Sequence, residues 1–273
     1  MSTAQLRREI SRLRERRSAR WRDIPADRVE FARVLGIAPD SWQRDLLRSE
    51  AHRTLLNCCR QSGKSTMAAL LALHRALSVP DSLVLCLAPA LRQSQELFAK
   101  VTGFYRDLGR PVPAEAEQRL GLELANGSRI AALPGSERTV RGFSGVDLLI
   151  VDEAARVEDA LVHSVRPMLA VSGGSLMMLS TPYGRRGVFY EEWTGGEDWE
   201  RYEVPATKCP RIPPEFLEAE RSSMPEWWYA QEFLCEFRET EDQLFTHEMI
   251  EGARADDLEK YRFEGDEDLW NIA

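Results

Sequence analysis

Long apolar runs are absent from this 273-residue sequence, which has no stretch near the about 18 consecutive apolar residues that a membrane-spanning helix needs. No apolar stretch follows its basic start, so a secretory signal is not expected, and the sequence contains neither internal repeats nor low-complexity tracts. Cysteine is also scarce: the five cysteines are an odd number and show no CxxC spacing. These absences predict a soluble globular protein of a reducing cytoplasm, with no membrane partner.

Basic residues are fewer than acidic residues in this chain. The chain has 36 Lys and Arg against 44 Asp and Glu, a net charge of −8, which argues against a uniformly basic nucleic-acid-binding protein. The charges are unevenly spread, because acidic residues dominate 236–268 whereas arginines crowd the first stretch. These arginines are Arg7, Arg8, Arg12, Arg14, Arg16, Arg17, Arg20 and Arg22. They are typical either of a solvated helix face or of a contact with a partner or DNA phosphates, and the sequence leaves both open.

Hydrophobic residues make up 43% of the chain, enough for one sizeable core with a small appendage. Short apolar runs alternate with helical patterns, which predicts a mostly parallel sheet covered on both faces. The Asn126-Gly127 pair between two apolar runs indicates a hairpin. The predicted strands are 55–59, 83–88, 120–124, 130–133, 146–151 and 175–179, and the predicted helices are 64–77, 91–108 and 157–170.

Beyond residues 199–204 the strand pattern stops, and prolines open two helical stretches at 213–224 and 225–237. We expect the aromatic residues of the second stretch to lie in a core. They are Trp227, Trp228, Tyr229, Phe233 and Phe237. The expected organisation is an Arg-rich helical extension (1–35), a central core (36–210), a small helical lid (211–260) and an acidic tail (261–273).

The segment NCCRQSGKST reads like a phosphate-binding loop of the form G-x-x-x-x-G-K-[ST] in which Cys58 replaces the first glycine. Such a loop works through backbone N–H groups that point into one cavity at a helix N-terminus. Gly63 is present, Lys64 can reach the β- and γ-phosphates, and the Ser65 hydroxyl can ligate Mg²⁺. A chance loop is the alternative, but the predicted strand before it and helix after it favour a nucleotide site. The predicted nucleotide contacts here are Cys59, Arg60, Gln61, Ser62, Gly63, Lys64, Ser65 and Thr66.

Two acids follow the apolar run at 148–151. Asp152 can hold Mg²⁺ through its water shell, and Glu153 can polarise the attacking water as a general base. A single acid would fit a strand that simply exits into a polar turn. An apolar tetrad followed by Asp-Glu-Ala, downstream of a phosphate loop, is typical of a nucleotide hydrolase instead.

Ser180, Thr181 and Pro182 follow the next predicted strand. Because ligands bind at the carboxyl edge of open α/β sheets, Ser180 and Thr181 are candidates for sensing a γ-phosphate and relaying its loss. The alternative is an ordinary turn, since Thr-Pro is a turn dipeptide.

Arginine is suited to stabilise the negative charge that develops during phosphoryl transfer, because its planar guanidinium group stays protonated and can bond two oxygens at once. Arg60 lies inside the loop, so it can contact a nucleotide in the same subunit or order the catalytic acid. Arg141 lies just before the acidic strand, and Arg138 competes with it. A surface arginine is the alternative for either of these two.

Taken together, CRQSGKST, TVRGFSG, LLIVDEA and LSTP resemble the ATPase domain of the large terminase subunit, the motor that packages tailed-phage genomes into procapsids. The resemblance covers about 39–237. Terminases commonly have a phosphate loop that lacks the first glycine and contains an arginine, which matches Arg60. The resemblance therefore implies that the missing glycine is a feature of the family. The resemblance also implies that Trp42 and Gln43 contact the adenine side, that Arg141 acts as a finger on a neighbouring subunit's ATP, and that 180–182 form the coupling motif.

The resemblance implies an α/β fold of the P-loop NTPase class (RecA-like, ASCE) with a mostly parallel central sheet and a small C-terminal helical lid. Its implied cofactors are ATP and Mg²⁺. The implied partners are double-stranded DNA, other copies in a ring on a portal protein, and the small terminase subunit, in the host cytoplasm. In the large terminases that this chain resembles, the motor domain is fused to an RNase H-like nuclease. This chain stops at Ala273, without room for that fold. We therefore expect an isolated motor domain without nuclease activity.

Two other functions compete with this interpretation. One is a superfamily 2 helicase-like ATPase, because DEA and STP resemble helicase motifs, although helicases need two such cores. The other is a nucleotide-binding assembly scaffold that does not hydrolyse, against which Glu153 speaks. The expected DNA contacts, for which solvated surface is an equal alternative, are Lys100, Arg106, Arg110 and Arg129.

Overall fold

The computed structural model describes residues 24–135, 142–196, 198–238, 249 and 252–253. The chain divides after Arg238 into two compact units, and the elements discussed below belong to the first. The predicted N-terminal helix at 1–23 and the acidic tail at 261–273 lie outside the described residues.

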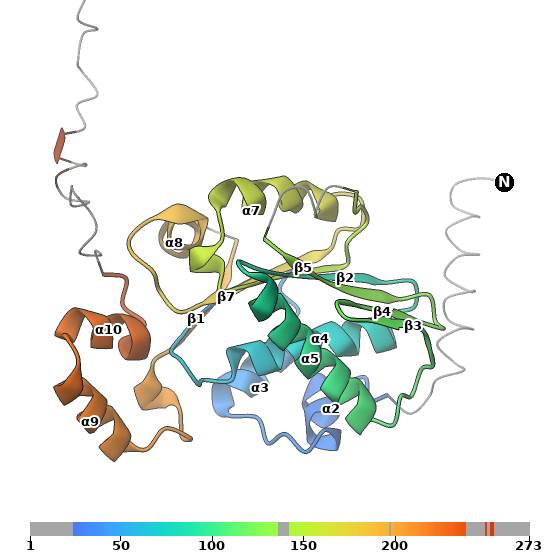
Figure 1. Cartoon of the computed structure of the whole chain (residues 1–273), viewed down its shortest axis with the longest axis horizontal. Helices are drawn as coiled ribbons and strands as arrows, with labels where there is room; N and C mark the ends of the chain where they lie inside the picture. Colours follow the sequence, from blue (N-terminus) through green and yellow to red (C-terminus); the bar gives the residue numbers. More distant parts are fainter. Residues whose placement is uncertain (1–23, 136–141, 197, 239–248, 250–251, 254–273) are drawn as a thin grey trace, which may run out of the picture. The chain divides into compact units, whose positions relative to one another are not determined.

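A mostly parallel sheet forms the centre of the first unit, in the strand order β3-β4-β5-β2-β6-β7-β1-β8 (Figure 1). The strands from β5 to β8 in this order pair in parallel, whereas β4 is antiparallel to both β3 and β5. This confirms the predicted sheet and hairpin. The strands are β1 Arg53–Cys58, β2 Leu83–Ala88, β3 Ala114–Gln118, β4 Gly121–Leu124, β5 Arg129–Pro134, β6 Leu148–Asp152, β7 Ser175–Ser180 and β8 Glu200–Val204.

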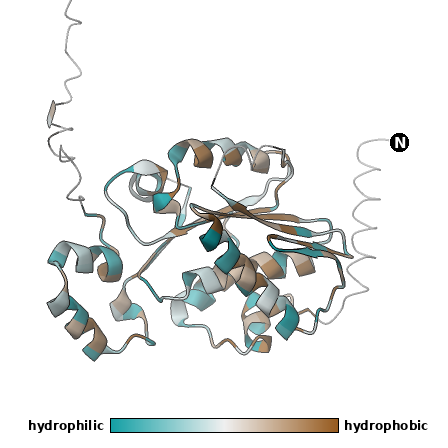
Figure 2. Ribbon diagram, viewed as in Figure 1, coloured by the Kyte–Doolittle hydropathy of each residue, from teal (hydrophilic) through white to brown (hydrophobic). Residues whose placement is uncertain are grey.

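Helices cover both faces of this sheet (Figure 1). One face carries α2 Arg28–Val34, α3 Ser41–Arg48, α4 Lys64–Ser78 and α5 Leu91–Asp107, and the other carries α7 Asp159–Val165 and α8 Gly187–Gly195. Successive strand residues point to opposite faces, so Leu56 of β1 joins the first core and Leu55 joins the second. This two-sided burial explains why the central strands are hydrophobic along most of their length (Figure 2).

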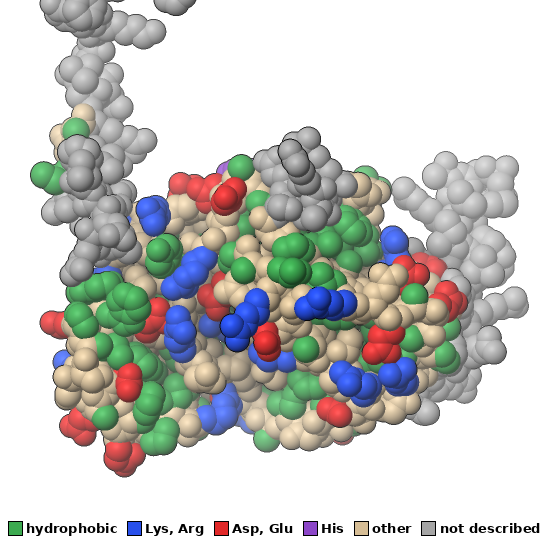
Figure 3. Space-filling model, viewed as in Figure 1, with side chains coloured by type: hydrophobic (Ala, Val, Ile, Leu, Met, Phe, Trp, Pro, Cys, Tyr) green, Lys and Arg blue, Asp and Glu red, His purple; other side chains and the backbone are tan. Residues whose placement is uncertain are grey.

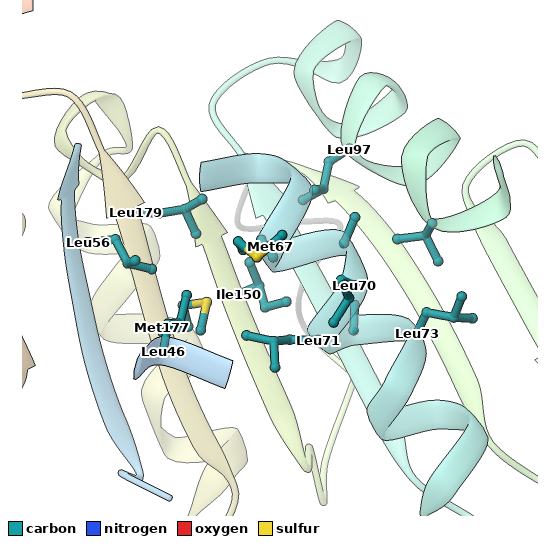
Figure 4. Close-up of a cluster of buried hydrophobic side chains, with 14 of the residues drawn as sticks. Leu46, Leu56, Met67, Leu70, Leu71, Leu73, Leu97, Ile150, Met177 and Leu179 are labelled. Atoms are coloured by element: carbon teal, nitrogen blue, oxygen red, sulfur yellow. The ribbon is translucent and has the colours of Figure 1, made fainter. Parts of the chain in front are cut away.

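The first core is built by α4 against the parallel strands. Met67, Leu70 and Leu71 of α4 are buried beside Ile150 of β6 and Met177 of β7 (Figure 4). Fully burying one such side chain contributes about 1.5–3 kcal/mol. The helix that follows the phosphate loop is therefore held on the sheet by its apolar side chains.

The structure departs from the predicted elements in several places, among them the helices α3 and α8, which were not predicted. β3 was not predicted, because its sequence AEAEQ has little apolar character and its residues are largely exposed. The predicted helix at 157–170 is divided into α7 and the 3₁₀ turn η2 Arg166–Leu169, since Pro167 cannot donate the next helical hydrogen bond. The predicted helix at 225–237 ends at Leu234, where Cys235 takes a φ of +62°.

The segment after β8 is helical, as predicted. It contains the 3₁₀ turn η3 Ala206–Lys208 and the helices α9 Pro214–Ser223 and α10 Glu226–Leu234. Of its aromatic residues, Tyr229 and Phe233 are buried, whereas Trp228 is 45% exposed, so the predicted burial of the aromatic set is correct only in part. In the part of the chain that the structure describes, helices long and apolar enough to cross a membrane are absent.

Candidate nucleotide-binding site

The predicted phosphate loop runs from the carboxyl end of β1 to the start of α4. Cys58 is the last residue of β1 and pairs with Val204 of β8, so its backbone is extended strand. A glycine is therefore not required at this position. The positive φ angles of the loop fall on Gln61 at +61° and Gly63 at +91°. A Cβ added at Gly63 would lie 2.9 Å from Nε2 of Gln43, so the glycine that matters for this backbone is the one that is present.

The side chains of Arg211 and Gln43 hold the loop through hydrogen bonds to its backbone. The carbonyl of Ser62 accepts hydrogen bonds from Nη2 of Arg211 at 2.6 Å and from Nε2 of Gln43 at 3.4 Å. Arg211 also forms an ion pair with Asp40 at 2.6 Å, which ties the start of α3 to the loop. Gln43 was predicted to lie at the site, and its burial here supports the loop. Arg211 was not predicted, because nothing in its local sequence distinguishes it from a surface arginine.

Two other residues predicted at the site do not present polar groups to the loop's cavity. Cys59 is buried, with its Sγ 3.7 Å from Sγ of Cys209. The hydrogen bond with Cys209 and burial raise the pKa of the Cys59 thiol, so it stays protonated. Trp42 is half-buried against the core, and its buried Nε1 has no hydrogen-bond partner among the described residues.

The two acids stand at the carboxyl end of β6, opposite the loop. Oε1 of Glu153 lies 3.4 Å from Nζ of Lys64, and Oδ1 of Asp152 lies 3.5 Å from Oγ of Ser65. Oδ1 of Asp152 also accepts the backbone N–H of Glu153 at 3.0 Å. The structure thus brings together the four residues that the sequence predicted from two separate motifs.

The surroundings of Asp152 disfavour its negative charge. Burial, and then the charge of Glu153, raise the pKa of Asp152 to about 6, although Lys64 and Ser65 act in the opposite direction. A divalent cation would relieve this penalty. Among the described residues no three His, Cys, Asp or Glu side chains form a group able to hold a metal by themselves. Ser65 and Asp152 therefore fit a cation that takes its remaining ligands from phosphate oxygens and water, as Mg²⁺ usually does.

Two arginines and a buried glutamate join the loop to α10. Nε of Arg60 forms an ion pair with Oε2 of Glu232, whose side chain is only 3% exposed. Nη2 of Arg156 lies 3.7 Å from the other carboxylate oxygen of Glu232. Arg60 was predicted at the site, whereas Arg156 and Glu232 were not. The position of Arg156 three residues after Glu153 was the available signal, while Glu232 is 172 residues from Arg60 in the sequence.

The predicted coupling segment lies between the loop and the acids. β7 pairs with β1 on one side and with β6 on the other, so Ser180, Thr181 and Pro182 emerge between the two motifs. All three are buried, and Oγ of Ser180 has no hydrogen-bond partner within the described part of the chain. Oγ1 of Thr181 accepts a hydrogen bond from Nη1 of Arg156 at 3.3 Å.

A cavity of about 920 Å³ opens beside these groups, a size within the range of about 300–1,000 Å³ typical of small-ligand sites. Its lining includes Gln93 and Lys100 of α5, and Phe216 and Phe233 from α9 and α10. Lys100, which was expected to contact DNA, thus lines the same cavity as the loop. The loop residues in the lining are Arg60, Gln61, Gly63, Lys64, Ser65 and Thr66, joined by Glu153, Arg156, Arg211, Ile212 and Pro213.

The other candidate DNA contacts differ in their surroundings. Arg106 is turned back onto its own helix, where its Nε donates to the carbonyl of Thr102 at 3.0 Å. Arg110 forms an ion pair with Glu117 at 3.1 Å, whereas Arg129, the first residue of β5, is exposed. Lys and Arg side chains lie across the middle of the face shown in Figure 3, with single Asp and Glu side chains among them. The finger candidates Arg138 and Arg141 lie outside the described residues.

A phosphate loop between a strand and a helix, with two acids at the end of a parallel strand two places along the sheet, defines a P-loop NTPase of the RecA-like class. The model of the family "Terminase large subunit, T4likevirus-type, N-terminal" matches residues 55–251, and the chain belongs to this family.

Curated relatives agree with the family assignment. The chain is 29% identical over 237 residues to the large terminase subunit of Thermus virus P23-45, covering 78% of this chain and 48% of the relative. It is 26% identical over 223 residues to that of Escherichia phage T5, covering 77% and 50%. The chain therefore spans about half the length of the curated relatives it matches.

Solved structures show the same fold. The ATPase domain of the Thermus phage P74-26 large terminase superposes with a TM-score of 0.69 at 25% identity, covering 80% of this chain and all of that domain. The large terminase of another thermophilic bacteriophage, solved in complex with ADP, superposes with a TM-score of 0.60 at 12% identity, covering 78% of this chain and 53% of that one.

Proposed function

We propose that the chain is the ATPase motor domain of a phage large terminase and hydrolyses ATP with Mg²⁺ to move double-stranded DNA into a procapsid. Its family and the names of its relatives support this proposal. The observation that carries it is the convergence of Lys64, Ser65 and Glu153 on a cavity large enough for a nucleotide, with Asp152 directly behind Ser65.

Each of these residues has a distinct task. The backbone of the loop and Lys64 bind the phosphates, because N–H groups at a helix N-terminus and an ammonium group both attract anions. Ser65 and Asp152 hold Mg²⁺, which when bound neutralises charge that develops on the phosphate oxygens. Glu153 orients the attacking water and accepts its proton.

The contacts of Glu153 suggest how binding prepares this residue. Its Oε1 lies 3.4 Å from Nζ of Lys64, so this ammonium group competes with any water for that oxygen. Phosphate oxygens in the cavity would attract Lys64 away from the carboxylate. Glu153 would then be released to accept a proton only when a nucleotide is present.

The remaining assignments follow from family membership. Arg141, with Arg138 as the alternative, acts as a finger on the site of the next copy in a ring. Trp42 and Gln43 lie toward the adenine, and 180–182 couple hydrolysis to movement. Of the predicted lid at 211–260, the part that belongs to the first unit contributes Phe216 and Phe233 to the lining of the cavity, which supports a lid role for α9 and α10. The chain works on a portal protein with the small subunit, in the host cytoplasm.

The test compares nucleotide binding with turnover in Lys64→Ala and Glu153→Ala variants. We expect Lys64→Ala to lose both, whereas Glu153→Ala should bind a fluorescent ATP analogue with unchanged affinity and lose about 10²-fold or more in single-turnover hydrolysis. Omission of Mg²⁺ should abolish hydrolysis by the wild-type chain. Unchanged hydrolysis by Glu153→Ala would refute the catalytic assignment, and a wild-type chain that binds ATP without hydrolysing it would favour the scaffold.

A further inference from the structure

The side chain of Arg156 ends among four residues from three segments of the chain. Nη1 lies 3.6 Å from Oε2 of Glu153 and donates a hydrogen bond to Oγ1 of Thr181 at 3.3 Å. Nη2 lies 3.7 Å from Oε1 of Glu232 on α10. The guanidinium also lies over the ring of Tyr183, with Cζ 4.5 Å from the ring centroid. The guanidinium, whose donor directions are fixed, is thus held by several partners, although part of it faces the cavity.

The backbone of this segment explains why Arg156 reaches back to Glu153. Glu153 has a φ of +52° and a ψ of +42°, a left-handed conformation that costs a residue with a side chain about 1–2 kcal/mol. It begins the 3₁₀ turn η1 Ala154–Arg156, in which residues three apart lie on one side. Arg156 is therefore placed beside the carboxylate of Glu153 by the turn itself. The ion pair helps to offset the cost of the turn.

The contact with Thr181 connects two motifs that the sheet places side by side. Thr181 is 1% exposed, and Tyr183 two residues later supplies the ring under the guanidinium. A change in the backbone of 181–183 would therefore move Arg156, and with it the oxygen of Glu153 that Arg156 contacts. Because all of these groups are buried or half-buried, their attraction is screened less than on an open surface.

We infer that Arg156 is a positioning residue, which fixes the carboxylate of Glu153 and joins it to Thr181 and Tyr183 of the coupling segment. This inference rests on the proposed function, since it assigns Arg156 a role in the hydrolysis attributed to Glu153. Arg156 acts through Glu153 rather than on the nucleotide. Its loss therefore leaves nucleotide binding intact and misplaces the general base.

Steady-state ATP hydrolysis by Arg156→Ala and Arg156→Lys tests the role. Misplacement of a catalytic group by about 1 Å costs up to about 10²-fold, so we expect kcat of Arg156→Ala to fall about 10–100-fold while KM for ATP changes less than about 3-fold. Arg156→Lys should recover part of kcat, because an ammonium group still donates to Glu153 and Thr181. A raised KM with unchanged kcat would show that Arg156 binds nucleotide and would overturn the inference, as would unchanged kinetics.

Arg186 provides a matched control. Its guanidinium lies over the same Tyr183 ring, with Cζ 5.6 Å from the centroid, and it is exposed. Arg186→Ala removes one stacking cation from Tyr183 but leaves Glu153 and Thr181 with their partners. We expect its kcat to stay within about 2-fold of wild type. An equal loss in Arg186→Ala and Arg156→Ala would overturn the inference, because the loss would then come from Tyr183 alone.

A stability cycle tests the contact without any nucleotide. Urea unfolding of Arg156→Ala, Thr181→Val and the double variant should be non-additive, with the double variant losing less than the sum of the single variants. The same cycle with Arg186 and Thr181 should be additive. Additivity in the first cycle would overturn the inference. Absence of hydrolysis by the wild-type chain would instead refute the proposed function, and the cycle would still report whether Arg156 holds Thr181.

Discussion

At the scale of single residues, the phosphate loop is governed by its backbone angles. The position where the consensus has its first glycine is a strand residue here, and Cys58 fits it because its backbone pairs with Val204. Gly63, in contrast, combines a φ of +91° with a close contact, because an added Cβ would lie 2.9 Å from Nε2 of Gln43 and would force that buried side chain to shift. The sequence could show which glycine was missing, but only the structure shows that it was dispensable.

Replacement of Gly63 by alanine should therefore disable the loop. The added Cβ would clash with Nε2 of Gln43, and the left-handed backbone costs an alanine about 1–2 kcal/mol, so we expect both a lower melting temperature and loss of ATP-analogue binding. Gly103→Ala is the matched control, because Gly103 lies inside α5 and a Cβ there meets nothing within 4 Å. It should be neutral or stabilising. Binding retained by Gly63→Ala would contradict this account.

The raised pKa of Asp152 makes stability depend on pH. Burial and Glu153 raise this pKa from its ordinary 3.8 to about 6, so between these values the folded chain binds more protons than the unfolded chain. Without metal, the free energy of unfolding should then fall as pH rises from about 4 to 6, by at most about 3 kcal/mol for this one group.

Asp152→Asn removes the group that titrates. We expect the variant to gain stability over wild type as pH rises through this window, and the gain to level off above about pH 7, in urea unfolding without Mg²⁺. Parallel curves for the two proteins would show that Asp152 is not the group responsible. With Mg²⁺ and nucleotide, the order should reverse, because the wild-type carboxylate binds the cation more tightly than the amide oxygen of asparagine.

At the scale of elements, the sequence predicted those whose signal is local. The strand at 83–88 and the helix that starts at Lys64 are found where they were expected, because a continuous apolar run and a phosphate loop each fix their own boundaries. β3 could not be predicted, since a polar edge strand is stabilised by its pairing with β4 rather than by its own residues. Arg211 and Glu232 could not be predicted for a similar reason: the fold brings them to the loop from far along the chain.

The β4–β5 hairpin depends on one buried side chain in its turn. Nδ2 of Asn126 donates to the carbonyl of Ala76 at the end of α4, at 2.8 Å, and its Oδ1 accepts from the N–H of Ser128 at 3.0 Å. Asn126→Ala would leave both groups without these partners, and we expect it to lower the free energy of unfolding by about 1–3 kcal/mol. Chemical denaturation measures this loss. Ser222→Ala, on the exposed face of α9, should change it by about 0.5 kcal/mol or less.

At the scale of the whole molecule, the proposed finger makes each active site the product of two copies. Arg141→Ala and Glu153→Ala should each be nearly inactive alone, because a finger is worth about 10³-fold or more. In mixed rings, a site that keeps Glu153 can receive Arg141 from a neighbouring Glu153→Ala copy. We expect mixing of the two inactive variants to restore hydrolysis, measured as phosphate release at a fixed total protein concentration.

The same experiment separates the two finger candidates. If Arg138 is the finger, Arg138→Ala rather than Arg141→Ala will be inactive alone and complemented by Glu153→Ala. No recovery with either variant, at concentrations where the copies associate, would remove the shared site from the proposal.

The hydrogen bonds on both sides of β7 limit how a reaction at the site could move the rest of the protein. This strand is hydrogen-bonded along its length to β1 and to β6, so sliding along its own axis would break two rows of bonds at once. The strand is therefore fixed along its length, and the chain can move only from residue 181 onward. If the proposed function is correct, movement driven by hydrolysis would start as a rotation of side chains and backbone at 181–183. The distance that DNA moves would then depend on the elements attached beyond these residues, not on sliding within the sheet.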